Sequence, residues 1–119
     1  MFQYLSENAE DLVAIKTSEK LDKDDLGRLL PQPEEKIKQY GKIRFFWEMD
    51  AFEGWKPTAF LQESLFDIKH LNDFYKIAIV GEKDWQEKLA DMMKHFSKAQ
   101  LKYFNSSQRQ EALDWVKEK

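Results

Sequence analysis

The chain has 119 residues, of which 42% are hydrophobic and 14% aromatic, and it contains no cysteine. This length and composition predict a single domain, residues 1–119, that folds without disulfides or a metal. Nineteen basic and 22 acidic side chains leave a net charge of −3, which disfavours nucleic acid as a partner because phosphate backbones attract an excess of positive charge. We find neither an export signal nor an apolar run of 18 residues, so we expect a cytoplasmic protein without membrane insertion.

Short segments with the composition of strands alternate with segments of helical period. β-Branched and aromatic residues favour central strands at Ile43–Met49 and Lys76–Val80. We expect further strands at Asp11–Thr17 and Leu101–Phe104. Phe2–Leu5 is predicted to pair with the strand at Asp11–Thr17, and the short turn between them requires an antiparallel hairpin.

Local capping signals mark the helix ends. Asp22 with Asp25 predicts one helix start, the prolines near Leu30–Pro33 predict a break, and Gly41 predicts an end. Three later helix starts are predicted at Pro57, at Asp84 with Glu87, and at a capping box of Ser107 with Gln110.

The apolar faces of these helices predict which side packs on the sheet. The helix from Pro57 to about Asp73 has one apolar arc, and the C-terminal helix has another that includes Ala112, Leu113 and Val116. In the helix that begins near Asp84, a stripe is expected to pack on the sheet, formed by Trp85, Leu89, Met92, Met93 and Phe96. Strands and helices in alternation predict an α/β fold with a mostly parallel sheet and right-handed crossovers.

Ligands of open α/β sheets collect beyond the carboxyl ends of the parallel strands, where three segments qualify. The first, Glu48–Lys56, combines carboxylates with aromatic rings: Glu48, Asp50, Phe52, Glu53 and Trp55. We consider three alternatives: a structured loop, in which Gly54 supplies a special backbone angle and an aromatic ring anchors the turn; a contact surface; and acid–base or metal chemistry.

The other two segments carry weaker signals. Gly81–Trp85 opens a helix whose amides are a potential anion site, but a single glycine favours a turn capped by Asp84. Asn105–Ser107 is predicted to cap a helix, because no histidine or Gly-x-Ser-x-Gly turn accompanies its hydroxyls.

The two histidines give little indication of catalysis. His70 lies one turn from Phe66, away from the centre of the core arc, so this pair is either a partner contact or ordinary surface. His95 lies near a predicted helix end with no second ligand at metal spacing. We therefore expect no catalytic residue, no metal site and no cofactor.

Several motifs together resemble the bacterial SpoIIAA-like family. They are Gly41-Lys42-Ile43-Arg44, the aromatic strand that closes in Glu48, Phe52-Glu53-Gly54-Trp55, the run Phe74–Gly81 with Trp85 after it, and Glu111-Ala112-Leu113-Asp114-Trp115. Such proteins are grouped with STAS domains and are similar to the Sec14-type, or CRAL-TRIO, fold. The resemblance implies about five strands, the first of them antiparallel, with four or so helices.

The resemblance does not extend to a known regulatory motif. Anti-sigma-factor antagonists carry a phosphorylatable serine in an Asp-Ser-Ser-Gly-like motif, where this chain has Asp50–Trp55. The nearby hydroxyls of Thr58 and Ser64 lie in no such motif.

We therefore expect a non-enzymatic, STAS-like regulatory or interaction module that binds a protein partner or itself. The expected contact residues are Glu48, Asp50, Phe52, Glu53, Trp55, Phe66 and His70. One alternative is a small apolar or lipid-like ligand held between a helix and the sheet. The other is an enzyme that uses Glu48, Asp50 and Glu53.

Overall fold

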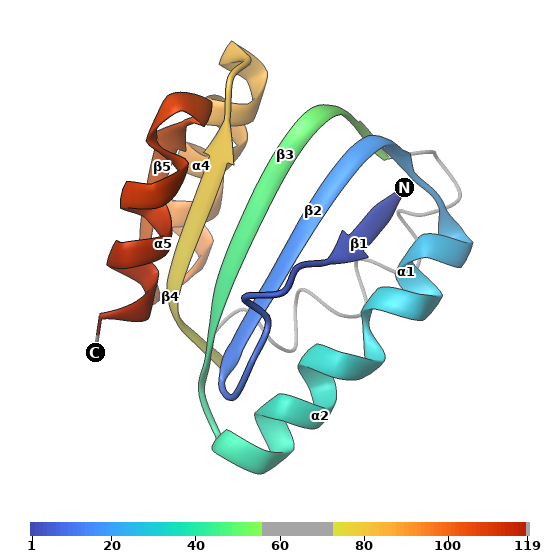
Figure 1. Cartoon of the computed structure of the whole chain (residues 1–119), viewed down its shortest axis with the longest axis vertical. Coiled ribbons are helices and arrows are strands. Elements are labelled where there is room, and N and C mark those ends of the chain that lie inside the picture. The colour runs from blue at the N-terminus through green and yellow to red at the C-terminus, as the bar shows by residue number, and fades with distance from the viewer. Residues whose placement is uncertain (56–72, 119) are drawn as a thin grey trace.

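The structure is a computed structural model that describes residues 1–55 and 73–118. Its strands form one sheet in the order β1-β2-β3-β4-β5 (Figure 1). β1 pairs antiparallel with β2, and the remaining neighbours pair in parallel, which confirms the predicted α/β sheet with an antiparallel first strand. The strands are β1 (Phe2–Tyr4), β2 (Leu12–Leu21), β3 (Ile43–Trp55), β4 (Phe74–Gly81) and β5 (Gln100–Asn105).

The described helices lie on both faces of this sheet. They are α1 (Lys23–Leu29), α2 (Pro31–Tyr40), α4 (Asp84–Phe96) and α5 (Arg109–Lys117), and the 3₁₀ turn η3 (Ser106–Gln108) precedes α5. In Figure 1 the strands run between α1 and α2 on one side and α5 on the other. The helix predicted from Pro57 to about Asp73 falls almost wholly in residues 56–72, outside the described part of the chain.

Along each strand the side chains point alternately to the two faces of the sheet, and this divides the buried residues into two cores. Val13 and Ile15 of β2 face one core, together with Leu26 of α1 and Ala90 of α4. Their neighbours in β2 face the other core with α5, which contributes Ala112, Leu113 and Val116. This is the expected consequence of the two-residue period of a strand that is buried on both faces.

The predicted signals at the first two helices are confirmed. Asp22 accepts a hydrogen bond from the Asp25 amide at 2.8 Å, and Asp25 accepts one from the Asp22 amide at 3.1 Å. α1 ends at Leu29 and α2 begins at Pro31, so the prolines do separate two helices. Gly41 ends α2 with a φ of 84°, a conformation that favours glycine.

The predicted caps of the two later helices are wrong by a few residues. Asp84 is the first residue of α4, and the amides of Glu82 and Lys83 donate instead to the side chain of Gln86. At the start of the C-terminal helix the capping side chains are those of Asn105 and Gln108, two residues before the predicted pair. In each case an amide side chain supplies the oxygen acceptor that we expected from a carboxylate or a hydroxyl.

β3 is much longer than predicted, because it continues from Met49 to Trp55. The segment that we expected to be a loop still pairs with β2, with Glu19 opposite Phe52 and Lys20 opposite Gly54. Irregular backbone makes this pairing feasible: Glu19 and Ala51 have φ values of 54° and 52°, and Gly54 has a φ of 106°. The special angle predicted for Gly54 is thus confirmed, but within a bulged strand.

The predicted apolar stripe of α4 does not all face the sheet. Trp85 is 37% exposed and Met92 is 52% exposed, whereas Gln86 and Ala90 are fully buried. Leu89 and Met93 pack partly against the core. The helical period predicted which residues share a stripe, but the fully buried side of α4 contains Gln86 and Ala90, beside that stripe.

Buried cations hold the end of α5 against the sheet. The Nη1 of Arg44 donates to the carbonyl oxygens of Val116 and Lys117, both at 2.9 Å. Lys76 Nζ donates to the carbonyls of Trp115 at 2.5 Å and Glu118 at 2.9 Å. These contacts satisfy the last carbonyls of α5 and complement the negative end of the helix dipole.

Asp11 completes this arrangement from the start of β2. It accepts hydrogen bonds from Arg44 at 2.5 Å and from the Tyr75 hydroxyl at 2.8 Å. Burial alone would raise the pKa of Asp11, but these two hydrogen bonds and the Arg44 charge lower it below its usual value. The carboxylate therefore stays ionised and orients Arg44 toward α5.

Candidate functional site

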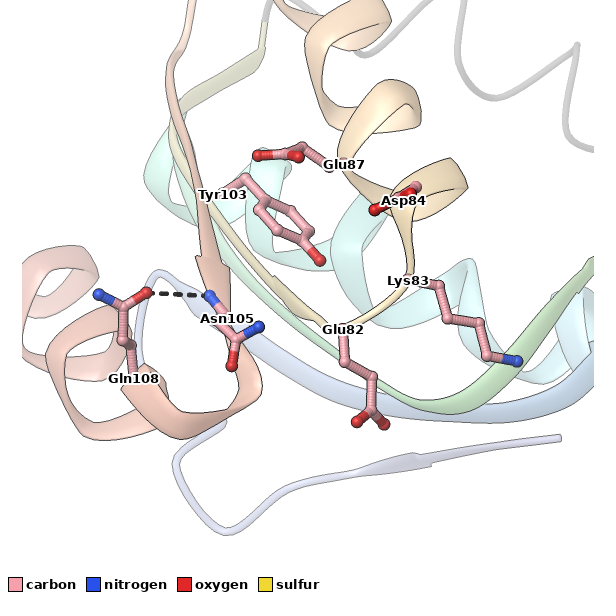
Figure 2. A pocket seen from close by; sticks show the side chains of 7 residues that line it. All are labelled: Glu82, Lys83, Asp84, Glu87, Tyr103, Asn105 and Gln108. Carbon is pink, nitrogen blue, oxygen red and sulfur yellow. Dashed lines mark hydrogen bonds between the residues drawn. The ribbon is translucent and has the colours of Figure 1, made fainter.

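A cavity of about 240 Å³ opens beyond the carboxyl ends of β4 and β5. From the start of α4 and the segment before it come Glu82, Lys83, Asp84 and Glu87, and from β5 and η3 come Tyr103, Asn105 and Gln108. Figure 2 shows Tyr103 reaching toward the first turn of α4, with Asn105 and Gln108 on the opposite side of the cavity. Two of the three segments expected to meet at this end of the sheet therefore do so.

Gln86 fixes the backbone on the α4 side of the cavity. Its Oε1 accepts hydrogen bonds from the amides of Glu82 at 3.0 Å and Lys83 at 3.3 Å. Its Nε2 donates to the carbonyl oxygen of Phe52 at 3.1 Å. One fully buried side chain thus ties the extension of β3 to the start of α4 and occupies amides that would otherwise attract an anion.

On the β5 side of the cavity, backbone amides are likewise paired with side chains of the same chain. Asn105 Oδ1 accepts hydrogen bonds from the amide and the hydroxyl of Ser107, each at 3.1 Å. Gln108 Oε1 accepts one from the Asn105 amide, also at 3.1 Å. These backbone donors at both helix starts are therefore already paired within the chain.

Most of the charged groups that line the cavity are negative. Three carboxylates and one ammonium group line the cavity. Burial raises the pKa of Tyr103, and the charges of Glu87, Asp84 and Glu82 raise it further. The negative charges of three carboxylates thus act on this one hydroxyl together.

The predicted carboxylate trio lies on β3, outside the lining of this cavity. Asp50 and Glu53 are exposed, and Asp50 lies 3.5 Å from Lys16 Nζ. Glu48 accepts a hydrogen bond from Arg109 Nε at 2.7 Å, which raises the pKa of that guanidinium. Two exposed carboxylates and one that is paired with arginine do not form the enclosed acid–base pair that the enzyme alternative requires.

The aromatic residues of the predicted contact set have different positions. Phe52 is fully buried and its ring lies 5.7 Å from that of Trp47, so it is a core residue and not an exposed partner contact. The reason is the extension of β3, which turns Phe52 toward the core. Phe66, His70, Lys56, Thr58, Ser64 and the side chain of Trp55 lie outside the described part of the structure.

Trp85 is an exposed aromatic residue that sequence reasoning placed in the core. Its ring lies 5.8 Å from that of Phe52, and 37% of the residue is accessible. Because it is the second residue of α4, it adjoins the cavity residues Asp84 and Glu87 along the same helix.

The described residues also bear on metal binding and on membrane insertion. They hold no group of three or more histidine, cysteine, aspartate or glutamate side chains arranged for a metal ion. His95 is exposed in the last turn of α4. No helix in the described ranges is long and apolar enough to cross a membrane.

Sequence reasoning missed Tyr103, Glu87 and Gln108 as members of one site. The usable signal was topological: if β4 and β5 are parallel neighbours, residues just after both strands must meet. The register places Gly81 opposite Asn105, so the segments that follow these residues line one cavity.

These observations define an α/β domain with four parallel strands, an antiparallel first strand and a polar cavity at the carboxyl end of the sheet. The profile of the SpoIIAA-like family matches residues 12–117, and the chain belongs to this family. This result confirms the family resemblance seen in the sequence.

A solved structure supports the same fold. The chain is similar to an uncharacterized protein of the DUF3478 family, with a SpoIIAA-like fold, from Shewanella loihica PV-4, with a TM-score of 0.81 and 23% identity. The likeness covers 97% of this chain and 93% of the other. No curated protein matches the chain.

Proposed function

We propose that this chain is a non-enzymatic, cytoplasmic module that binds a protein partner, or a second copy of itself, at the carboxyl end of the sheet. The supporting observation is a set of exposed side chains on rigidly held backbone. We call this set the acidic surface, formed by Asp50, Glu53, Glu82, Asp84 and Glu87.

The backbone beneath the acidic surface is held from both sides. Gln86 joins the carbonyl of Phe52 to the amides before α4, and β3 pairs with β2 as far as Trp55. Preorganised side chains lose less conformational entropy on binding. This feature supports a docking surface.

Trp85 gives the surface an exposed aromatic anchor, the role that we expected of Phe52 and Trp55. Tryptophan is enriched among the residues that dominate interface energies, because it buries a large area with few rotatable bonds. The rim of charged groups around it would set orientation and the rate of association.

Among residues 1–55 and 73–118, the apolar-ligand alternative gains no comparable support. Charged and amide side chains line the cavity at the carboxyl end, whereas sites for lipid-like molecules are lined mostly by apolar side chains. We therefore keep protein binding as the proposal.

Photo-crosslinking inside cells tests this proposal directly. We would place benzoylphenylalanine at position 53, on the acidic surface, and as a control at position 39, an exposed residue in the last turn of α2. We expect a discrete adduct from position 53, at twice the chain mass if the module binds itself. Adducts of equal yield from both positions, or none from either, would contradict the proposal.

A further inference from the structure

The cavity within the acidic surface suggests what the partner carries. We propose that it accepts the cationic side chain, arginine in preference to lysine, of a basic segment in the partner protein. This inference rests on the proposed function, since it names the chemistry recognised at the same surface.

The sign of the ligand charge follows from the hydrogen bonds. Helix starts normally favour anions, because their first amides are unpaired. Here the amides just before α4, those of Glu82 and Lys83, and the amide of Ser107 donate to amide side chains of the same chain. The three carboxylates that line the cavity outnumber its one ammonium group, so the lining favours a ligand with donors and positive charge.

The lining is suited to a guanidinium group. Glu82, Asp84 and Glu87 come from one short stretch and act together on the Tyr103 hydroxyl, while Asn105 and Gln108 lie across the cavity. A planar guanidinium has five donors in a fixed arrangement that suits paired carboxylate oxygens, whereas an ammonium group is a compact point charge. An arginine side chain can therefore form more hydrogen bonds with this lining than a lysine side chain can.

The cavity is also smaller than most ligand pockets. Pockets for drug-sized molecules and cofactors are usually about 300–1,000 Å³, and this one measures about 240 Å³. A single long side chain is a better match than a whole cofactor.

Charge outside the cavity favours a basic segment over an isolated cation. β3 and β4 pair with Glu48 opposite Val80, and β3 continues beyond this point to Trp55. Asp50 and Glu82 each follow two residues after this pair, so carboxylates of the acidic surface come from β3 as well as from the segment before α4. Electrostatic complementarity of this extent would steer a basic partner and weaken as salt rises.

An NMR titration of the whole ¹⁵N-labelled chain tests the inference. The probe is acetyl-arginine amide, and the control ligand is acetyl-citrulline amide, which has nearly the same shape without the charge. We expect arginine to shift the amides of residues 82–87 and 103–108 in a saturable manner, and citrulline to shift them little. Equal shifts with both ligands, or shifts scattered over the chain, would overturn the inference.

Two variants sharpen the test. Glu87 and Glu111 are both exposed glutamates in the first turn of a helix, but Glu87 alone of the two lines the cavity. We expect Glu87→Gln to weaken arginine binding about fivefold and Glu111→Gln to change it less than about twofold. Equal effects of both substitutions would assign the binding to general charge attraction and refute a cavity site.

The two proposals can fail separately. Arginine binding without a protein adduct from position 53 would leave a site for free cations and refute the basic-segment inference together with the proposed function. An adduct without arginine binding would retain the docking function and refute the partner chemistry.

Discussion

Gly81 lies at the end of β4, where two packed side chains leave no room for a third. A Cβ atom at this position would lie 2.5 Å from Gln86 Oε1 and 2.9 Å from the Tyr103 hydroxyl oxygen. Gln86 is fully buried and hydrogen-bonded on both sides, so it cannot readily move away. We predicted Gly81 as a turn residue, but the structure shows that it permits close packing beneath the cavity.

The substitution Gly81→Ala is therefore expected to destabilise the fold by about 1–3 kcal/mol, because it overpacks a tight contact. Gly27 is the matched control: it lies in α1, and a Cβ atom there would meet nothing within 4 Å. Gly27→Ala should stabilise the chain by about 0.5–1 kcal/mol through the higher helix propensity of alanine. Urea unfolding of both variants gives the comparison, and similar free energies of unfolding would refute the steric argument.

At the scale of elements, α5 depends on residues far from it in the sequence. Arg44 of β3 and Lys76 of β4 are 5% and 7% exposed, and together they bind four carbonyl groups at the end of the helix. A helix end without such partners would leave buried carbonyls unsatisfied. These cations thereby fix the position of α5. The turn η3, which ends at Gln108, directly precedes that helix.

We expect Arg44→Met to reduce the free energy of unfolding by about 3 kcal/mol, because it removes a buried cation from Asp11 and from two carbonyls. Lys117→Met, an exposed change in α5 itself, should cost less than about 0.5 kcal/mol. Native-state hydrogen exchange should show the α5 amides opening more readily in the Arg44 variant. If α5 exchange is unchanged there, the proposed capping role is wrong.

Elements with strong local signals were predictable from the sequence. The Asp22 cap, the break before Pro31 and the antiparallel hairpin depend on contacts between near neighbours, so the sequence alone indicates them. The extension of β3 was not predictable, because Asp50, Glu53 and Gly54 are typical of loops and are retained in the strand by pairing with β2. The exposure of Trp85 was missed for a related reason: helical period is local, whereas burial depends on the whole packing.

The sequence predicted where the candidate site lies but not all of the residues that form it. The carboxyl end of the sheet was the expected location, and Glu82 and Asp84 lie in segments that we singled out there. Tyr103 and Gln108 join them only through the pairing of β4 with β5. The choice of a buried glutamine as the backbone clamp has no signal in a single sequence.

At the scale of the whole molecule, helices cover both faces of the sheet, and among residues 1–55 and 73–118 several carboxylates near its carboxyl end are exposed. α1 and α4 contribute to one core and α5 to the other, so the apolar side chains are mostly used in joining the layers. The acidic surface comprises exposed residues on the extension of β3 and at the start of α4, so a partner reaches it without disturbing either core. The central claim is that this end of the sheet is the binding surface.

Amide hydrogen exchange, read by mass spectrometry on the chain alone and in complex with the partner identified by crosslinking, tests that claim most directly. We predict slower exchange in residues 48–54, 82–87 and 103–108 on binding, with α2 and the end of α5 unchanged. Protection confined to α2 or to the outer face of α5, with these three segments unaffected, would contradict the account.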